Sequence, residues 1–143
     1  MTRDVITVHE SSLFADILDI FLQKKLTSLP VIDDNKQLKG MLSQYDLLYR
    51  LFPSPEKFYL DIRYFTDYSH IEEERGELKK LCARDLMNPK YFSVSPDDHI
   101  LKACSLVVTN SLSRLPVKED ENLVGIVVAK RLTKQYLPSI FRG

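Results

Sequence analysis

Thr27-Ser28-Leu29-Pro30-Val31 occurs a second time as Ser113-Arg114-Leu115-Pro116-Val117, 86 positions further along the chain. The same order of signals surrounds each copy. A short apolar segment, a polar helix start and an amphipathic stretch precede it, and an acidic turn, a second apolar strand and a last helix follow it. A repeat of this length indicates two copies of one supersecondary unit, each of which needs the other to bury its apolar face.

The composition limits the classes of protein to which this chain can belong. Its 143 residues suffice for one compact unit with a sizeable core. Twenty basic and twenty acidic residues cancel, so no overall field would attract nucleic acid or an anionic membrane. The longest apolar runs are far shorter than a bilayer span, and no signal-peptide pattern is present. We therefore expect a cytoplasmic protein that does not insert into membranes.

The cysteines and histidines argue against metal or redox chemistry. Cys82 and Cys104 are too few and too far apart for a zinc or redox motif, and their apolar neighbours indicate reduced thiols. His9, His70 and His99 show no metal-ligand spacing, so we expect them to be exposed or to cap helices. The sequence predicts no metal site.

The first repeat occupies residues 1–52. We expect its three strands over 5–8, 29–32 and 38–42. Ser11 or Ser12 offers an N-cap for a first helix. The predicted core face of that helix comprises Phe14, Ile17, Leu18, Phe21 and Leu22. Ser43 opens a second helix, whose predicted apolar side comprises Leu47, Leu48 and Leu51.

The second repeat occupies residues 83–143. We expect its strands over 91–94, 115–118 and 123–128, with a last helix after them. Ser95-Pro96-Asp97-Asp98 predicts a helix start. The predicted core positions of that helix are Ile100, Leu101, Cys104, Val107 and Val108. The acidic turn is one residue shorter than in the first repeat, a change that a surface turn tolerates.

An insert over residues 53–82 separates the repeats. Its first half concentrates the aromatic residues Phe58, Tyr59, Tyr64, Phe65 and Tyr68. Its second half, from Glu72 to Leu81, has the charge pattern of a helix. We favour a packed linker, and the alternative is a contact surface for a second subunit or a partner, since aromatic residues are common at interfaces.

The second repeat begins with a short lead-in helix that the first repeat lacks. Cys82-Ala83-Arg84-Asp85-Leu86-Met87 forms this segment, and Met87 aligns with Met1. Three explanations remain open: a true start further upstream, a module cut from a longer chain, or a dimer partner that covers the corresponding surface.

These features resemble the CBS domain family, in which two tandem motifs form one Bateman module. The resemblance rests on the paired Leu-Pro-Val strands, the strands that carry Gly40 and Gly125, the lead-in helix and Ser43-Gln44-Tyr45-Asp46. It implies an α/β (α+β) fold of two β-α-β-β-α motifs packed about a pseudo-twofold axis, with two clefts between them. It also implies a regulatory module that binds an adenosine-containing ligand, associates as a homodimer and catalyses nothing.

Ser43-Gln44-Tyr45-Asp46 is the first candidate ligand-binding motif. Taken alone, it is typical of a helix cap in which Ser43 accepts a backbone N–H and Asp46 reaches back, favoured by the helix dipole. By the resemblance, the Asp46 carboxylate accepts hydrogen bonds from both ribose hydroxyls and Ser43 lies near the phosphate. The two roles can coexist.

The second repeat departs from this motif, because Val128-Ala129-Lys130-Arg131 stands in its place. Arg131 cannot accept a hydrogen bond from a ribose. Lys130 and Arg131 also oppose the helix dipole, a cost that a nearby anion would offset. Arg114 has the fork geometry that suits phosphate oxygens, whereas its counterpart is only Ser28.

This layout resembles that of the gamma subunits of AMP-activated protein kinase, where a motif with Arg in place of Asp lends basic residues to a neighbouring site. By that resemblance Asp46 holds the ribose, and Arg114 and Lys130 face the phosphate. Thr7, Ile6 and Met41 line the adenine pocket. We therefore expect one adenine nucleotide per module, with AMP, ADP or ATP preferred. S-adenosylmethionine, NAD and a cyclic dinucleotide stay open as ligands, and the basic residues favour a phosphorylated ligand over S-adenosylmethionine.

Three functions compete. The first is a ligand sensor that regulates an enzyme or a transporter. The second is a dimerisation module that binds no ligand. An enzyme ranks third, because the sequence shows no nucleophile–base pair, metal cluster or Gly-rich phosphate loop, and has only four glycines. No catalytic cofactor is expected.

Overall fold

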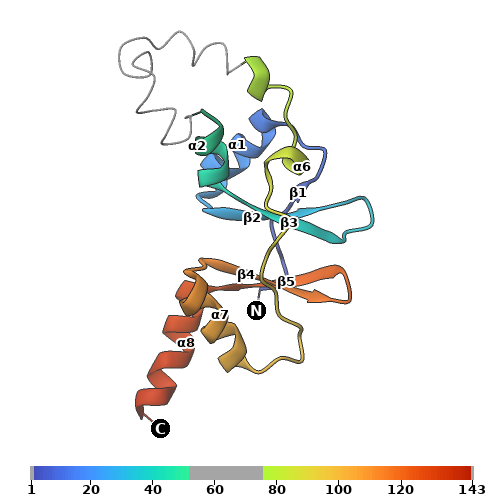
Figure 1. Ribbon diagram of the computed structural model, residues 1–143. Helices are drawn as coiled ribbons and strands as arrows, with labels where there is room; N and C mark the ends of the chain where they lie inside the picture. Colours follow the sequence, from blue (N-terminus) through green and yellow to red (C-terminus); the bar gives the residue numbers. More distant parts are fainter. Residues whose placement is uncertain (1, 52–75, 143) are drawn as a thin grey trace, which may run out of the picture.

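The computed structural model describes residues 2–51 and 76–142, and it contains two similar α/β units. The elements of the first unit are β1 (Val8–His9), α1 (Phe14–Lys24), β2 (Ser28–Ile32), β3 (Leu38–Ser43) and α2 (Gln44–Leu51). Those of the second unit are α7 (Ile100–Asn110), β4 (Arg114–Glu119), β5 (Asn122–Val128) and α8 (Ala129–Arg142). The lead-in helix α6 (Ala83–Leu86) precedes them in the sequence but packs on the first unit. In Figure 1 the two sheets lie in the middle of the molecule, with α1, α2 and α6 outside one sheet and α7 and α8 outside the other.

Each sheet is built around an antiparallel hairpin that begins with the repeated motif. β2 pairs with β3 so that Pro30 faces Met41 and Val31 faces Gly40. β4 pairs with β5 in the matching register, with Pro116 opposite Ile126. β1 adds a parallel strand to the first sheet through Val8 and Val31, and the second sheet has the equivalent single bridge between Val94 and Val117. The predicted hairpin strands are confirmed, each slightly longer than expected.

A pseudo-twofold axis relates the two units, as the contacts between equivalent residues demonstrate. The Thr27 and Ser113 hydroxyls lie 2.9 Å apart, and these residues are 86 positions apart. At the far ends of the hairpins, Gln37 bridges Asn122, its own counterpart in the second unit. The hairpins therefore meet at two points on the axis, and the predicted packing about it is confirmed.

The segments that lead into the two units cross to the opposite sheet. Thr2 forms an antiparallel bridge with Ile126 of β5, and Asn88 forms the equivalent bridge with Met41 of β3. Residues 3–7 and 89–93 must then span from one sheet to the other. The predicted strands over 5–8 and 91–94 are wrong for this reason, because only Val8–His9 and Val94 reach a partner on their own sheet.

The predicted helix starts also differ from the structure. α1 begins after Leu13, which makes no side-chain capping bond, so neither Ser11 nor Ser12 is the N-cap. The Ser95–Asp98 segment forms a turn in which Asp98 Oδ2 accepts from the Ser95 backbone nitrogen at 2.8 Å. His99 then caps α7, its Nδ1 accepting from the Leu101 backbone nitrogen at 3.0 Å. The capping histidine was expected, but the helix starts later than the sequence indicated.

The core consists of two clusters, one between each sheet and its own helices. The cluster of the first unit comprises Val8, Ile17, Phe21, Leu29, Val31, Leu42, Leu47, Ala83 and Leu86. Among the residues whose burial is described, the cluster of the second unit has four buried members: Val94, Ala103, Leu115 and Val117. The first core is therefore larger, and α6 contributes two of its residues.

Part of each predicted core face is wrong. The exposed members are Leu18, Leu22 and Leu48 in the first unit and Ile100, Leu101 and Val108 in the second. Each helix contacts its sheet along a narrow line, such as Ile17 and Phe21 one turn apart on α1. The apolar stripe of each helix is wider than the surface that the sheet covers.

Gly40 allows the chain at Met87 and Asn88 to approach β3 closely. A Cβ at this position would lie 2.7 Å from Met87 Sδ and 2.8 Å from the Asn88 carbonyl oxygen. We expect Gly40→Ala to lower the free energy of unfolding by about 1–3 kcal/mol, the usual cost of overpacking. Urea unfolding followed by circular dichroism would measure it. Gly76→Ala is the matched control, since a Cβ there meets nothing within 4 Å, and equal losses in both variants would contradict the prediction.

Part of the insert lies outside the residues that the structure describes. The predicted aromatic cluster at Phe58–Tyr68 and the start of the charged helix at Glu72 lie outside them. Leu78, from the end of the insert, is buried. None of the helices in residues 2–51 and 76–142 combines the length and apolarity that crossing a bilayer requires.

Candidate functional site

A cleft of about 360 Å³ lies between the two units at the ends of β2, β3 and β4. We call it the Asp46 cleft. The first unit lines it with Thr27, Ser28, Met41, Leu42, Ser43, Tyr45 and Asp46. The second unit and its lead-in segment contribute Asn88, Lys90–Phe92, Ser111–Arg114 and Pro116. The pseudo-twofold contact between Thr27 and Ser113 forms part of this lining.

Asp46 is held in place by hydrogen bonds from Ser43. Its Oδ2 accepts from the Ser43 backbone nitrogen at 2.7 Å and from the Ser43 hydroxyl at 3.1 Å. Ser43 Oγ accepts in turn from the Asp46 backbone nitrogen at 3.3 Å. The predicted helix cap is confirmed. Because all the carboxylate bonds use Oδ2, Oδ1 has no hydrogen-bond partner among the described residues and remains available to a ligand.

Two buried polar atoms in the cleft have no hydrogen-bond partner within residues 2–51 and 76–142: Ser28 Oγ and Arg114 Nε. Buried polar atoms nearly always have a hydrogen-bond partner, so two such atoms without one in a single cleft are unusual. Burial lowers the pKa of the Arg114 guanidinium, and the positive charge of Arg131 lowers it further. An anion in the cleft would compensate both the desolvation and the repulsion.

Aromatic residues also line the cleft, and the sequence analysis did not place Tyr91 and Phe92 in the site. Tyr91 is held by two bonds of its hydroxyl, which donates to the Leu38 carbonyl and accepts from Lys118 Nζ, each at 3.2 Å. Lys118 Nζ also lies 5.2 Å from the centre of the Tyr91 ring. Phe92 and Tyr45 line the cleft and are partly exposed. The sequence signal of Tyr91 and Phe92 was an apolar strand. Only the crossing of the lead-in segment brings them to the cleft that Asp46 also lines.

The structure brings together four of the eight predicted site residues: Met41, Ser43, Asp46 and Arg114. The other four are Ile6, Thr7, Lys130 and Arg131, and none of them lines the Asp46 cleft. Lys130 is exposed in the first turn of α8. Lys90 is a basic residue that does line the cleft and that the sequence did not single out.

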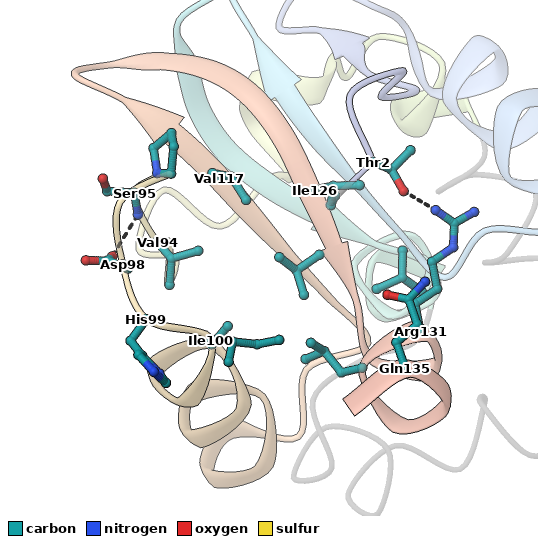
Figure 2. A pocket seen from close by; sticks show the side chains of 15 residues that line it. Thr2, Val94, Ser95, Asp98, His99, Ile100, Val117, Ile126, Arg131 and Gln135 are labelled. Carbon is teal, nitrogen blue, oxygen red and sulfur yellow. Dashed lines mark hydrogen bonds between the residues drawn. The ribbon is translucent and has the colours of Figure 1, made fainter. Parts of the chain in front are cut away.

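A second hollow, of about 300 Å³, lies between β4, β5 and the helices α7 and α8 (Figure 2). We call it the Arg131 groove. Val94, Ile100, Val117 and Ile126 make much of its wall apolar. Arg131 lies at its rim, and its Nη1 donates to the Thr2 hydroxyl. Arg131 occupies the position equivalent to Asp46, so the groove has a guanidinium at the place where the cleft presents a carboxylate.

The fold and the cleft define a module of two repeated β-α-β-β-α units with a ligand-sized cleft at their junction. The family model for the CBS domain matches residues 1–53 and again residues 83–137. The chain belongs to the CBS domain family, as its sequence motifs predicted.

The relatives include proteins of plants and animals. The chloroplastic CBS domain-containing protein CBSX2 of Arabidopsis thaliana is 33% identical over 138 residues, which cover 91% of this chain and 58% of CBSX2. The gamma-3 subunit of the 5'-AMP-activated protein kinase of Sus scrofa is 25% identical over 126 residues, covering 87% of this chain and 22% of the subunit. The chain thus spans less than two thirds of either relative. The predicted similarity to the gamma subunits is confirmed.

A solved structure of CBSX2 in complex with AMP shares the fold. It superimposes with a TM-score of 0.74 and 27% identity, over 98% of this chain and 94% of that chain.

Proposed function

We propose that this chain is a regulatory CBS pair that binds one adenine nucleotide in the Asp46 cleft and catalyses no reaction. The observation that carries the proposal is a pair of buried atoms, Ser28 Oγ and Arg114 Nε, that have no hydrogen-bond partner in the described part of the chain. They lie in a cleft that also presents the Asp46 carboxylate. A nucleotide supplies both an anion for Arg114 and hydroxyl donors for Asp46. The complex of CBSX2 with AMP supports this choice of ligand.

Each group in the cleft has a role in this proposal. Asp46 Oδ1 accepts from the ribose hydroxyls, and Arg114 donates to phosphate oxygens, with Ser28 and Ser43 close by. Met41 and Phe92 enclose the adenine. Lys90 takes the phosphate-facing role that the sequence assigned to Lys130, because Lys90 lines the cleft.

Isothermal titration with AMP tests the proposal. We expect one site per chain, and Arg131→Ala should leave the stoichiometry and the affinity largely intact, because Arg131 lines the other hollow. Two equivalent sites, or turnover of the bound nucleotide, would contradict the proposal. Mass spectrometry of ligand released from the purified protein would identify the natural nucleotide.

Arg114→Ala should weaken the binding of AMP much more than the binding of adenosine. Loss of a charge-assisted hydrogen bond to phosphate costs roughly 1.5–3 kcal/mol, or about ten- to 150-fold in Kd. Adenosine has no phosphate, so its Kd should barely change. Lys130→Ala is the control, since Lys130 is a basic residue outside the cleft. Equal losses for AMP and adenosine would show that Arg114 does not face the phosphate.

A dimerisation module that binds no ligand is the second candidate function. Leu18 and Leu22 on α1, and Leu101 and Val108 on α7, are exposed apolar side chains of the kind that a homodimer would cover. Sedimentation would detect the dimer, and a thermal-shift screen distinguishes the functions, because only a sensor is stabilised by nucleotide. We propose that the module is cytoplasmic and regulates an enzyme or a transporter.

A further inference from the structure

Tyr91 belongs both to the Asp46 cleft and to a hydrogen-bond network outside it. Its side chain forms part of the lining of the cleft. Its hydroxyl donates to the Leu38 carbonyl on β3 and accepts from Lys118 Nζ on β4, each at 3.2 Å. These two strands belong to different units. One side chain thus connects a ligand-sized cleft with both hairpins.

The network continues to the place where the ends of the two hairpins meet. The Leu38 backbone nitrogen donates to the Glu121 carbonyl at 2.9 Å, and the Leu123 nitrogen donates to the Lys36 carbonyl at 3.4 Å. We call this contact between residues 36–38 and 121–123 the hairpin junction. None of these six residues lines the Asp46 cleft. A change in the cleft can therefore reach the junction only through other residues.

Lys118 links the Tyr91 hydroxyl to the acidic turn of the second hairpin. Its ammonium lies 3.6 Å from Glu121 Oε2 and 5.2 Å from the centre of the Tyr91 ring. The hydrogen bond to Tyr91 raises the pKa of the Lys118 ammonium, and the charge of Glu121 raises it further. A charged ammonium can only donate, so the hydroxyl proton is left for the Leu38 carbonyl. Every hydrogen bond of the network therefore has a defined donor and acceptor.

The network occurs on one side of the pseudo-twofold axis. The repeat maps Tyr91 onto Val5 and Lys118 onto Ile32. Neither of these apolar side chains has a donor or an acceptor. The lead-in segment of the first unit nevertheless reaches β5, through the bridge between Thr2 and Ile126. The fold therefore does not require such a network, and the side that has it is the side with the Asp46 cleft.

We propose that Tyr91 couples the Asp46 cleft to the hairpin junction, so that a ligand in the cleft stabilises the contact between the two hairpins. This inference rests on the proposed function and adds a route by which occupancy of the cleft reaches the rest of the module. A ligand that packs against the partly exposed Tyr91 ring restricts its motion and keeps the hydroxyl between Leu38 and Lys118. The coupling is reciprocal, so a weaker junction lowers the affinity for the ligand by the same factor.

Amide hydrogen exchange at Leu38 tests the coupling, because this amide spans the junction. The reference is the Ala83 amide, which donates to the Ser12 carbonyl at 2.8 Å outside the network. Any overall stabilisation by the ligand slows both amides. We expect saturating AMP to slow exchange at Leu38 at least about fivefold relative to Ala83. Tyr91→Phe should abolish this difference, because the variant keeps the ring and loses the hydroxyl.

Tyr45→Phe is the matched control for this variant. Tyr45 also lines the Asp46 cleft, and its ring stacks on that of Tyr49. Within residues 2–51 and 76–142 its hydroxyl makes no hydrogen bond to either hairpin. At saturating AMP, Tyr45→Phe should therefore keep the slower exchange at Leu38. If Tyr91→Phe kept it as well, the coupling would be overturned.

The reciprocal effect is measured by titration with AMP. Lys118→Met should lower the affinity at least about fivefold, although Lys118 does not line the cleft. Lys39→Met controls for the loss of a distant positive charge. Lys39 is a lysine of the first hairpin whose Nζ lies 3.5 Å from Asp33 Oδ2, outside the cleft and the network. An unchanged affinity in Lys118→Met, or equal losses in both variants, would contradict the coupling.

The coupling and the proposed function fail in different ways. If AMP bound but slowed Leu38 and Ala83 equally, the coupling would be overturned and the proposed function would stand. If AMP did not bind, the proposed function would be overturned. The proteins without ligand would then decide whether Tyr91 holds the junction, since Tyr91→Phe should speed exchange at Leu38 and not at Ala83.

Discussion

Asp46→Ala is expected to lower the affinity for AMP by about a hundredfold or more and to leave no measurable heat in a titration. Two hydrogen bonds from ribose hydroxyls to a carboxylate contribute roughly 1.5–3 kcal/mol each, and the variant loses both. Asp46 is already fixed through Oδ2 by Ser43, so Oδ1 meets the ribose without first losing side-chain freedom.

The control for this variant must lose a helix cap without losing a ligand contact. Asp85 provides it, because its Oδ2 accepts from the Cys82 backbone nitrogen at 3.0 Å and from Cys82 Sγ at 3.3 Å. Cys82 and Asp85 thus form the same kind of helix-capping box as Ser43 and Asp46, but Asp85 does not line the cleft. Asp85→Ala should lose about 0.5–2 kcal/mol of stability and bind AMP normally.

Binding should be measured at a temperature where circular dichroism shows both variants folded. If Asp85→Ala lowered the affinity for AMP as much as Asp46→Ala does, the loss would come from the missing helix cap. The ribose role of Asp46 would then be refuted.

Leu29→Ala should cause the largest loss of stability, about 2–5 kcal/mol. Leu29 lies in the repeated motif on the middle strand of its sheet, is fully buried and packs in the larger core cluster. That loss is a large part of the 5–15 kcal/mol by which a domain of this kind is stable. Urea unfolding with a constant m-value would measure it.

Its counterpart Leu115 offers an internal comparison. Leu115 is equally buried but belongs to the smaller core, which opens onto the Arg131 groove. The cost of a cavity depends on how far its surroundings can relax, so Leu115→Ala should cost less than Leu29→Ala. Val108→Ala, on an exposed side chain, should change stability by less than about 0.5 kcal/mol. If Leu115→Ala lowered the free energy of unfolding as much as Leu29→Ala or more, the second core would be as tightly packed as the first.

Local signals in the sequence predicted the hairpins, the lead-in helix and the Ser43–Asp46 cap. These features depend on neighbours within a few positions, such as the acidic turn between two apolar strands or a carboxylate three residues from a hydroxyl. The helix faces were predicted less well. Leu22 and Leu101 have the spacing of core residues but are exposed, because periodicity shows that a stripe is apolar and not how much of it a sheet covers.

The cleft could be predicted only in part. Met41, Ser43 and Asp46 lie close together on one hairpin and its following helix, so the sequence alone grouped them. Tyr91 and Phe92 escaped because their segment reads as a strand of the second unit, whereas Asn88 binds the edge of the first sheet. Hydrogen bonds between distant segments have no periodic signal in the sequence.

The sequence by itself determined that the chain is a duplicated unit and that the copies differ at Asp46 and Arg131, because residue identity at equivalent positions needs no coordinates. Only the tertiary structure decided which residues share a cleft and which core is left open. Both depend on the lead-in segments that cross to the opposite sheet at Asn88 and Thr2. The crossing at Asn88 places α6 in the core of the first unit. The crossing at Thr2 brings Thr2 to the rim of the Arg131 groove, which is open.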